Sequence, residues 1–169
     1  MENIKLIENG TITDVEGFKS SGVVGNIKGK NTGKKDVALI YSEDECVAAG
    51  VFTTNKVRSK TIDVCIENLK NNIKAIVVNS GNANACVGKR GYDDAKRMTQ
   101  IVAEELSIPS EKILVSSTGV IGVKLPMDRI ENGVRLACQN LKDDGGIDTA
   151  KAIMTTDLVM KNIAIDVKL

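Results

Sequence analysis

The sequence predicts a fold of the α/β or α+β class, and three observations support this prediction. The chain has 169 residues, which suits one domain (residues 1–169) that can bury a core of its own. Its apolar content is mainly Val, Ile, Leu and Ala, with only two Phe, two Tyr and no Trp. Two buried-strand patterns are each followed by a Gly-rich loop and a helical pattern. Because ligands collect at the carboxyl ends of such strands, we expect the two loops, residues 79–91 and 116–125, to form one pocket.

The first part of the chain is predicted to be an exposed segment followed by a hairpin. Residues 17–36 are rich in Gly and Lys, which predicts an irregular, exposed start. Their lysines could bind a polyanion, but no aromatic residues are interleaved with them, and this favours a solvated, flexible segment. Two apolar runs follow at residues 36–42 and 45–54, separated by an acidic turn at Glu43 and Asp44. We interpret these runs as a hairpin of buried strands.

The first strand–loop–helix unit occupies the middle of the chain. Residues 62–72 place apolar side chains on one helical face, which predicts a helix ahead of the unit. The apolar run at residues 73–80 predicts a buried strand that enters a loop rich in Gly and Asn at residues 81–91. Residues 92–106 then repeat apolar side chains at helical spacing.

The second unit repeats this order. Residues 112–117 predict a buried strand. After a Gly-rich loop, Pro126 opens a helix as a favoured first-turn residue, and that helix ends at residues 143–146. A short helix at residues 148–154 and a strand at residues 161–169 complete the predicted order.

Composition excludes several classes of function. Lys and Arg number 23 and Asp and Glu number 22, so the net charge of +1 provides no general attraction to nucleic acid or to an anionic membrane. No segment is long and apolar enough to span a membrane and the N-terminus has no signal-peptide pattern, so we expect a cytoplasmic protein. The four cysteines lack the spacing of a metal site and histidine is absent, so we expect no bound metal.

The absence of histidine also limits the chemistry that this chain can perform. A Ser-His-Asp or Cys-His arrangement cannot be assembled from the chain alone. Covalent catalysis would therefore need a lysine, a carboxylate or an N-terminal amine as the base.

The loop at residues 81–91 has glycines and a lysine, as a phosphate-binding loop does, but it departs from that motif. A P-loop needs Gly where this chain has Ala83, and Ser or Thr where it has Arg90. Asparagines tolerate left-handed backbone, so a tight turn before a helix is the simpler interpretation, with a pocket wall as the alternative.

The stretch VSSTGVIG, residues 115–122, combines hydroxyls and glycines at the end of a strand. Thr118 offers a hydroxyl donor and Gly119 an unobstructed backbone N–H, and two such donors can stabilise an oxyanion. A simple Gly turn is the alternative interpretation. Thr118 is disfavoured as a nucleophile because no convincing base lies near it in the sequence.

A second group of hydroxyls occurs in IMTTD, residues 153–157. Thr155 and Thr156 lie between a predicted helix and a predicted strand. Hydrogen bonds of these side chains to the backbone of a turn are the simplest interpretation from the sequence alone.

Five stretches, in order along the chain, resemble one known family. They are GFKSSGVVGNIK with DVALIYS, AAGVFTTNKV, VVNSGNANACVG, VSSTGVIGVKLPMDRI and AIMTTD, and they span about residues 17–157. Together they resemble the N-terminal (α) part of the ornithine acetyltransferase family, also called glutamate N-acetyltransferase, of arginine biosynthesis. The resemblance implies an α+β fold, a layered sandwich of helices around central β-sheets.

The resemblance also implies a mechanism. In that family a precursor cleaves itself before a threonine, and the new N-terminal Thr of the β chain carries the acetyl group from N-acetylornithine to glutamate. Such a Thr supplies its own amine as the base, which agrees with the absence of histidine. Thr118 and Gly119 match the family's oxyanion-hole pair. A threonine of MTTD matches a substrate-binding position, with Thr155 favoured over Thr156.

The same resemblance implies a partner chain. Leu169 precedes the cleavage motif, so we expect an α chain without the nucleophile, active only with its β chain in an α2β2 heterotetramer. No metal or dissociable cofactor is expected, and acetyl-CoA could be a second acetyl donor. Two alternatives stay open: a subunit of an N-terminal-nucleophile amidase or aminopeptidase, and a non-catalytic binding module on the same fold.

Overall fold

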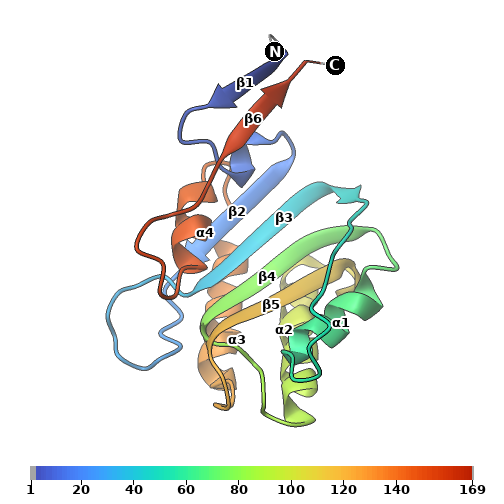
Figure 1. Ribbon diagram of the computed structural model, residues 1–169, viewed down its shortest axis with the longest axis vertical. Helices are drawn as coiled ribbons and strands as arrows, with labels where there is room; N and C mark the ends of the chain where they lie inside the picture. Colours follow the sequence, from blue (N-terminus) through green and yellow to red (C-terminus); the bar gives the residue numbers. More distant parts are fainter. Residues whose placement is uncertain (1–2, 169) are drawn as a thin grey trace.

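The computed structural model describes residues 3–168 and contains one four-stranded and one two-stranded sheet (Figure 1). The strands are β1 (Ile4–Ile7), β2 (Phe18–Val23), β3 (Val37–Cys46), β4 (Ile73–Asn82), β5 (Ile113–Val120) and β6 (Ala164–Val167). The helices are α1 (Lys60–Asn68), α2 (Arg90–Leu106), α3 (Met127–Gln139) and α4 (Gly146–Ala152), with short 3-10 turns at Ile12–Asp14 and Ser110–Lys112. None of the described helices is long and apolar enough to cross a membrane.

The larger sheet has the strand order β2-β3-β4-β5. β3 is antiparallel to both of its neighbours, β2 and β4, whereas β4 and β5 run parallel. Parallel neighbours need a crossover connection, and α2 lies in the segment that connects these two strands. The carboxyl ends of β4 and β5 therefore lie at the same edge of the sheet.

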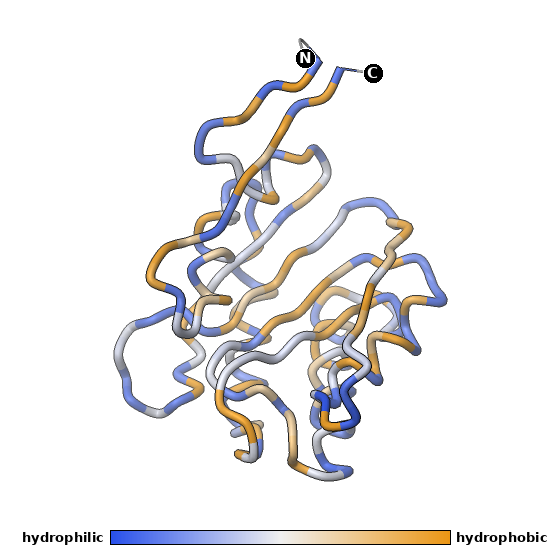
Figure 2. Tube along the Cα trace, viewed as in Figure 1, coloured by the Kyte–Doolittle hydropathy of each residue, from blue (hydrophilic) through white to orange (hydrophobic). Residues whose placement is uncertain are grey.

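The alternation of side chains along β4 defines the two faces of this sheet. Ile73, Ala75 and Val77 are buried, the last two in the main core, whereas Ile76 and Val78 on the opposite face are only half-buried. Residues of α1, α2 and α3 fill the core on the first face, among them Val64, Met98, Ile101, Ile130 and Val134. Figure 2 shows hydrophobic residues along the central strands, while the loop that follows β2 is mostly hydrophilic.

The opposite face is covered by α4 where β2 and β3 lie. A Cβ atom on Gly22 would lie 2.0 Å from the carbonyl oxygen of Asp148, so this helix approaches the β2 backbone directly. The preceding residue, Ser21, points to the other side and donates to the Ala137 carbonyl of α3 at 2.7 Å. Consecutive residues of β2 thus contact helices on opposite faces, as the period of a strand requires.

The two-stranded sheet brings together the two ends of the described chain. β1 and β6 are antiparallel, with Ile4 opposite Val167 and Ile7 opposite Ala164. Figure 1 shows this pair at one end of the molecule, away from the parallel strands β4 and β5.

Most of the predicted elements are confirmed, and so is the α+β class. The predicted helices at residues 62–72, 92–106 and 148–154 correspond to α1, α2 and α4, and the predicted strands at 73–80 and 112–117 correspond to β4 and β5. The strand predicted at residues 161–169 is shorter than expected, because β6 covers only Ala164–Val167 and Leu169 lies outside the described residues. Pro126 precedes α3 as its N-cap instead of occupying the first turn.

Two predictions near the N-terminus are wrong. Residues 17–36 include β2, whose last four residues are buried, so only the part after Val23 is an irregular loop. The hairpin at residues 36–54 does not exist, because β3 continues through Glu43 and Asp44 as one strand and residues 47–59 have no regular structure. Two acidic residues of this strand are paired with lysines, Glu43 with Lys19 at 2.8 Å and Glu45 with Lys112.

Candidate functional site

The two Gly-rich loops begin side by side at the edge of the sheet. In the parallel pairing of β4 with β5, Ser80 is opposite Thr118 and Gly81 is opposite Gly119. This confirms that the two strand–loop–helix units converge at the carboxyl ends of their strands. The predicted oxyanion pair therefore lies beside a backbone segment from the other loop.

The two opposed glycines have the same unusual backbone conformation. Gly81 and Gly119 both have φ of +130°, a region that other residues rarely adopt. A Cβ atom on Gly119 would lie 2.3 Å from the carbonyl oxygen of Gly81 and 2.9 Å from the backbone nitrogen of Asn82. The two strands approach each other so closely here that Gly119 has no room for a side chain.

Thr118 faces the side of the sheet that carries α4. Paired residues share a face, so Thr118 points to the same side as Ser80, Ile76 and Val78, away from the main core. Thr118 is half-buried and Gly119 is exposed. Within residues 3–168, no side-chain hydrogen bond involves the Thr118 hydroxyl, which leaves it able to donate to a ligand. The use of this pair as an oxyanion hole stays a prediction.

A buried network fixes the strand ends from the core side. The Ser117 hydroxyl donates to Asn79 Oδ1 at 2.6 Å, and Asn79 Nδ2 donates to the carbonyl oxygen of Asn82 at 3.1 Å. Asn82 Nδ2 in turn donates to the carbonyl oxygen of Lys124 at 3.0 Å, which holds the loop after β5. These bonds hold the backbone on both sides of Thr118 and Gly119, so Ser117 has a structural role.

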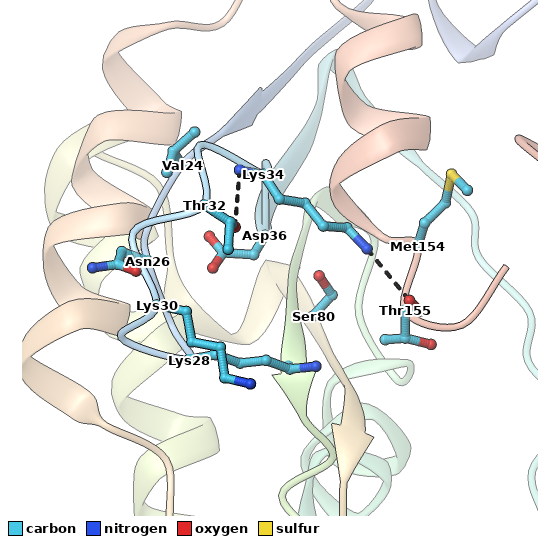
Figure 3. A pocket seen from close by; sticks show the side chains of 11 residues that line it. Val24, Asn26, Lys28, Lys30, Thr32, Lys34, Asp36, Ser80, Met154 and Thr155 are labelled. Atoms are coloured by element: carbon cyan, nitrogen blue, oxygen red, sulfur yellow. Dashed lines mark hydrogen bonds between the residues drawn. The ribbon is translucent and has the colours of Figure 1, made fainter. Parts of the chain in front are cut away.

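A small cavity of about 70 Å³ lies next to this edge of the sheet (Figure 3). Its walls are the loop between β2 and β3, the end of β4 and the segment after α4, and the lining residues are Val24, Asn26, Lys28, Lys30, Thr32, Lys34, Asp36, Ser80, Gly81, Met154 and Thr155. The loop at residues 116–125 does not line it. The expected pocket wall is therefore present at Ser80 and Gly81, but the second wall comes from elsewhere in the chain.

Only one of the two candidate threonines of the MTTD stretch lines this cavity. Thr155 is half-buried and lines the cavity, whereas Thr156 is exposed and does not. Lys34 Nζ donates to the carbonyl oxygen of Thr155 at 3.3 Å, so the segment after α4 is tied to the loop across the cavity. A substrate-binding role for Thr155 or Thr156 stays a prediction.

The loop between β2 and β3, residues 24–36, is held at its base by Asp36. The Asp36 carboxylate accepts from the backbone N–H groups of Gly25 at 2.6 Å and Ile27 at 2.7 Å. The neighbouring Lys35 forms an ion pair with Asp148 of α4 at 2.5 Å, and the hydrogen bond from Lys35 lowers the pKa of Asp148. No site was predicted in this loop from the sequence. The feature that could have indicated one is its group of lysines, Lys28, Lys30 and Lys34.

The comparisons with known proteins agree on one family. Residues 19–169 match a family described as the ArgJ family. A protein of Clostridium acetobutylicum named arginine biosynthesis bifunctional protein ArgJ 1 is 47% identical over 167 residues, which cover 98% of this chain and 40% of that protein. The arginine biosynthesis bifunctional protein ArgJ of a Synechocystis species is 46% identical over 171 residues, with 100% and 41% coverage. The chain thus spans about two-fifths of the length of these curated relatives.

Two solved structures have the same fold. The crystal structure of the arginine biosynthesis bifunctional protein ArgJ of Bacillus halodurans has a TM-score of 0.86 at 36% identity, with 98% of this chain and 93% of that chain covered. An ornithine acetyltransferase of Mycobacterium tuberculosis, solved in complex with ornithine, has a TM-score of 0.91 at 36% identity, with 96% and 88% coverage. From its sequence and its fold alike, the chain belongs to the ArgJ family.

Proposed function

We propose that this chain is the α part of an acetyltransferase of arginine biosynthesis that moves an acetyl group from N-acetylornithine to glutamate. The observation that carries the proposal is the pairing of Thr118 and Gly119 with Ser80 and Gly81, which presents two adjacent donors on an accessible strand end. The family assignment supports it, since the relatives are named arginine biosynthesis bifunctional proteins and a structural neighbour is named an ornithine acetyltransferase.

The nucleophile in this proposal belongs to a partner β chain. The sequence has no histidine, so its own hydroxyls lack the usual base. The curated relatives are more than twice as long as this chain, whereas the solved chains are close to it in length, which is consistent with an α part separate from the rest. An N-terminal threonine of the partner would use its own amine as the base.

The proposed reaction is a two-step exchange. The hydroxyl oxygen of the partner threonine attacks the acetyl carbonyl carbon of N-acetylornithine, and Thr118 Oγ1–H and the Gly119 N–H stabilise the oxyanion. The C–N bond then breaks, ornithine leaves with the proton on its amine, and the acetyl group remains on the threonine. The amine of glutamate attacks this ester, forms N-acetylglutamate and restores the hydroxyl.

Other elements of the proposal follow from the same reaction. We propose Thr155 in preference to Thr156 as the substrate-binding threonine, because Thr155 lines the cavity beside the strand ends. We also propose that the chemistry needs no metal or dissociable cofactor, with acetyl-CoA as an optional second donor that the word bifunctional in the names of the relatives supports. The assembly would be an α2β2 heterotetramer in the cytoplasm.

The proposal is tested by substituting Thr118 in the complete two-chain protein. Thr118→Ala removes one donor, and kcat for acetyl transfer should fall by about 10²–10³. Thr118→Ser keeps the hydroxyl and should stay within about tenfold of the wild type, because only a methyl group is lost. Unchanged kcat in Thr118→Ala would refute the oxyanion role, and release of acetate without N-acetylglutamate would indicate a hydrolase instead.

A further inference from the structure

The loop between β2 and β3 gathers positive charge around the cavity. Lys28, Lys30 and Lys34 line it, and Figure 3 shows their side chains extending from the loop toward β4 and the segment of Thr155. All three are exposed, and among residues 3–168 none of them lies within 4.0 Å of a carboxylate oxygen. Their neighbour Lys35, by contrast, is paired with Asp148. The three cavity lysines therefore have charges that no described residue neutralises by direct contact.

The single carboxylate in the cavity wall, that of Asp36, accepts hydrogen bonds from the backbone of its own loop. Both oxygens of Asp36 accept backbone N–H groups, one from Gly25 and one from Ile27, so this side chain serves the fold of the loop. Three ammonium groups face one carboxylate across the cavity, and the lining has a positive balance. An anion of small size is the ligand that this arrangement favours.

The cavity is lined by Ser80, the residue paired with Thr118, so it lies one strand away from the predicted oxyanion pair and on the face to which Thr118 points. A Cβ atom on Gly81 would lie 3.1 Å from Ile27 Cγ2 and 3.4 Å from Lys28 Cγ, so the loop rests directly on Gly81. Gly81 is the residue paired with Gly119. Since neighbouring strands are about 4.8 Å apart, a ligand with its acetyl carbonyl at Thr118 and Gly119 would reach the cavity with the end of its side chain.

The two substrates of the proposed function differ at that end. Ornithine ends in an ammonium group and glutamate in a carboxylate, whereas both have the same α-amino and α-carboxylate groups. The α-carboxylate is bonded to the carbon next to the reacting nitrogen, so it stays close to the oxyanion pair. Neither Thr118 nor Gly119 lines the cavity, which favours the more distant side-chain group as its occupant.

We infer that Lys28, Lys30 and Lys34 form the subsite that binds the side-chain carboxylate of the acceptor glutamate. The inference rests on the proposed function and adds to it a basis for acceptor choice. The same charges repel the side-chain ammonium of ornithine and so favour the exchange of departing ornithine for incoming glutamate. The hydrogen bond from Lys34 to the Thr155 carbonyl closes the subsite on the α4 side.

The test compares two triple variants of the complete two-chain protein with equal loss of charge. Lys28→Gln, Lys30→Gln and Lys34→Gln are combined in one variant, and the exposed residues Lys5, Lys56 and Lys168 are changed to Gln in the control. Glutamate and its neutral isostere glutamine serve as acceptors, and N-acetylornithine serves as donor. An exposed ion pair contributes roughly 0.2–1 kcal/mol, so losing three should raise KM for glutamate by about tenfold.

Selectivity decides between the possible roles of these lysines. The loop variant should lose most of its preference for glutamate over glutamine and regain that preference when all three positions are Arg. Its KM for N-acetylornithine should not rise, because the substitutions remove charges that repel the side-chain ammonium of this donor. The control should keep the wild-type preference. An equal rise of KM for glutamate and for N-acetylornithine would assign the lysines to the α-carboxylate that both compounds share and would overturn the inference. An unchanged preference for glutamate over glutamine would also overturn it.

A binding measurement separates this inference from the proposed function. Calorimetric titration of glutamate and of glutamine into the wild-type protein and the loop variant requires no turnover. Preferential binding of glutamate that is lost in the loop variant would support the subsite even if no acetyl transfer were found, and the proposed reaction alone would then fail. Equal binding of the two amino acids by the wild-type protein would overturn the subsite.

Discussion

Replacing Gly119 with Ala tests the close approach of β4 and β5 most directly. The new Cβ atom would lie 2.3 Å from the Gly81 carbonyl oxygen and 2.9 Å from the Asn82 nitrogen, both of them backbone atoms that cannot rotate away. The φ of +130° adds strain, since an L residue rarely adopts it. Backbone strain costs about 1–3 kcal/mol and overpacking a further ~1–3 kcal/mol, so the free energy of unfolding should fall by about 2–6 kcal/mol.

Gly122→Ala is the matched control because it lies in the same loop. Gly122 has φ of +76°, and nothing lies within 4 Å of the position of its Cβ atom. Its substitution should cost only about 1 kcal/mol, from conformation alone. Urea unfolding of the complete protein, with acetyl transfer measured in parallel, compares the two variants. The reasoning is refuted if Gly119→Ala is no more destabilising than Gly122→Ala.

Two further predictions concern carboxylates. Asp36→Asn leaves one acceptor oxygen where two backbone N–H groups donate now, so the loop at residues 24–36 should lose about 1–3 kcal/mol of local stability. Hydrogen exchange at Gly25 and Ile27 should therefore accelerate about 5-fold or more, and equal protection in Asp36→Asn and in the exposed control Asp44→Asn would contradict this. Burial raises the pKa of Asp94, even though Arg90 lies nearby, so the folded protein favours the protonated carboxyl. As pH rises above about 4 the carboxyl ionises in the unfolded chain, and the free energy of unfolding decreases. Asp94→Asn should thus raise the unfolding free energy by about 1 kcal/mol at pH 7 and by little near pH 3, and a gain independent of pH in thermal melts would count against the burial argument.

The parts of the fold that could be predicted are those specified by local pattern. The run at residues 73–80 and the helical spacing at 92–106 each determine their element without distant partners, so β4 and α2 were found. The repeat of that unit predicted that the two loops converge, but the register that brings Ser80 opposite Thr118 is known only from the structure.

The parts that were missed depend on distant contacts. β2 has the polar sequence FKSSGV. Its Ser21 can be buried because its hydroxyl donates a hydrogen bond to the backbone carbonyl oxygen of Ala137, which is far away in the sequence. Glu43 and Asp44 indicated a turn, but Lys19 and Lys74 of the neighbouring strands contact Glu43 and hold it in β3. The cavity was missed for the same reason, since its walls come from three segments that meet only in the folded chain.

The pairing of Ser80 with Thr118 also determines when the candidate site can form during folding. The two residues are joined through the whole of α2, and the donors acquire their positions only when β5 has docked beside β4. Closing such a connection is slow compared with forming a single helix, and its loss on heating is part of the global transition. The pairing of Ser80 with Thr118 should therefore be lost together with the cooperative unfolding of the sheet and not in a separate earlier step.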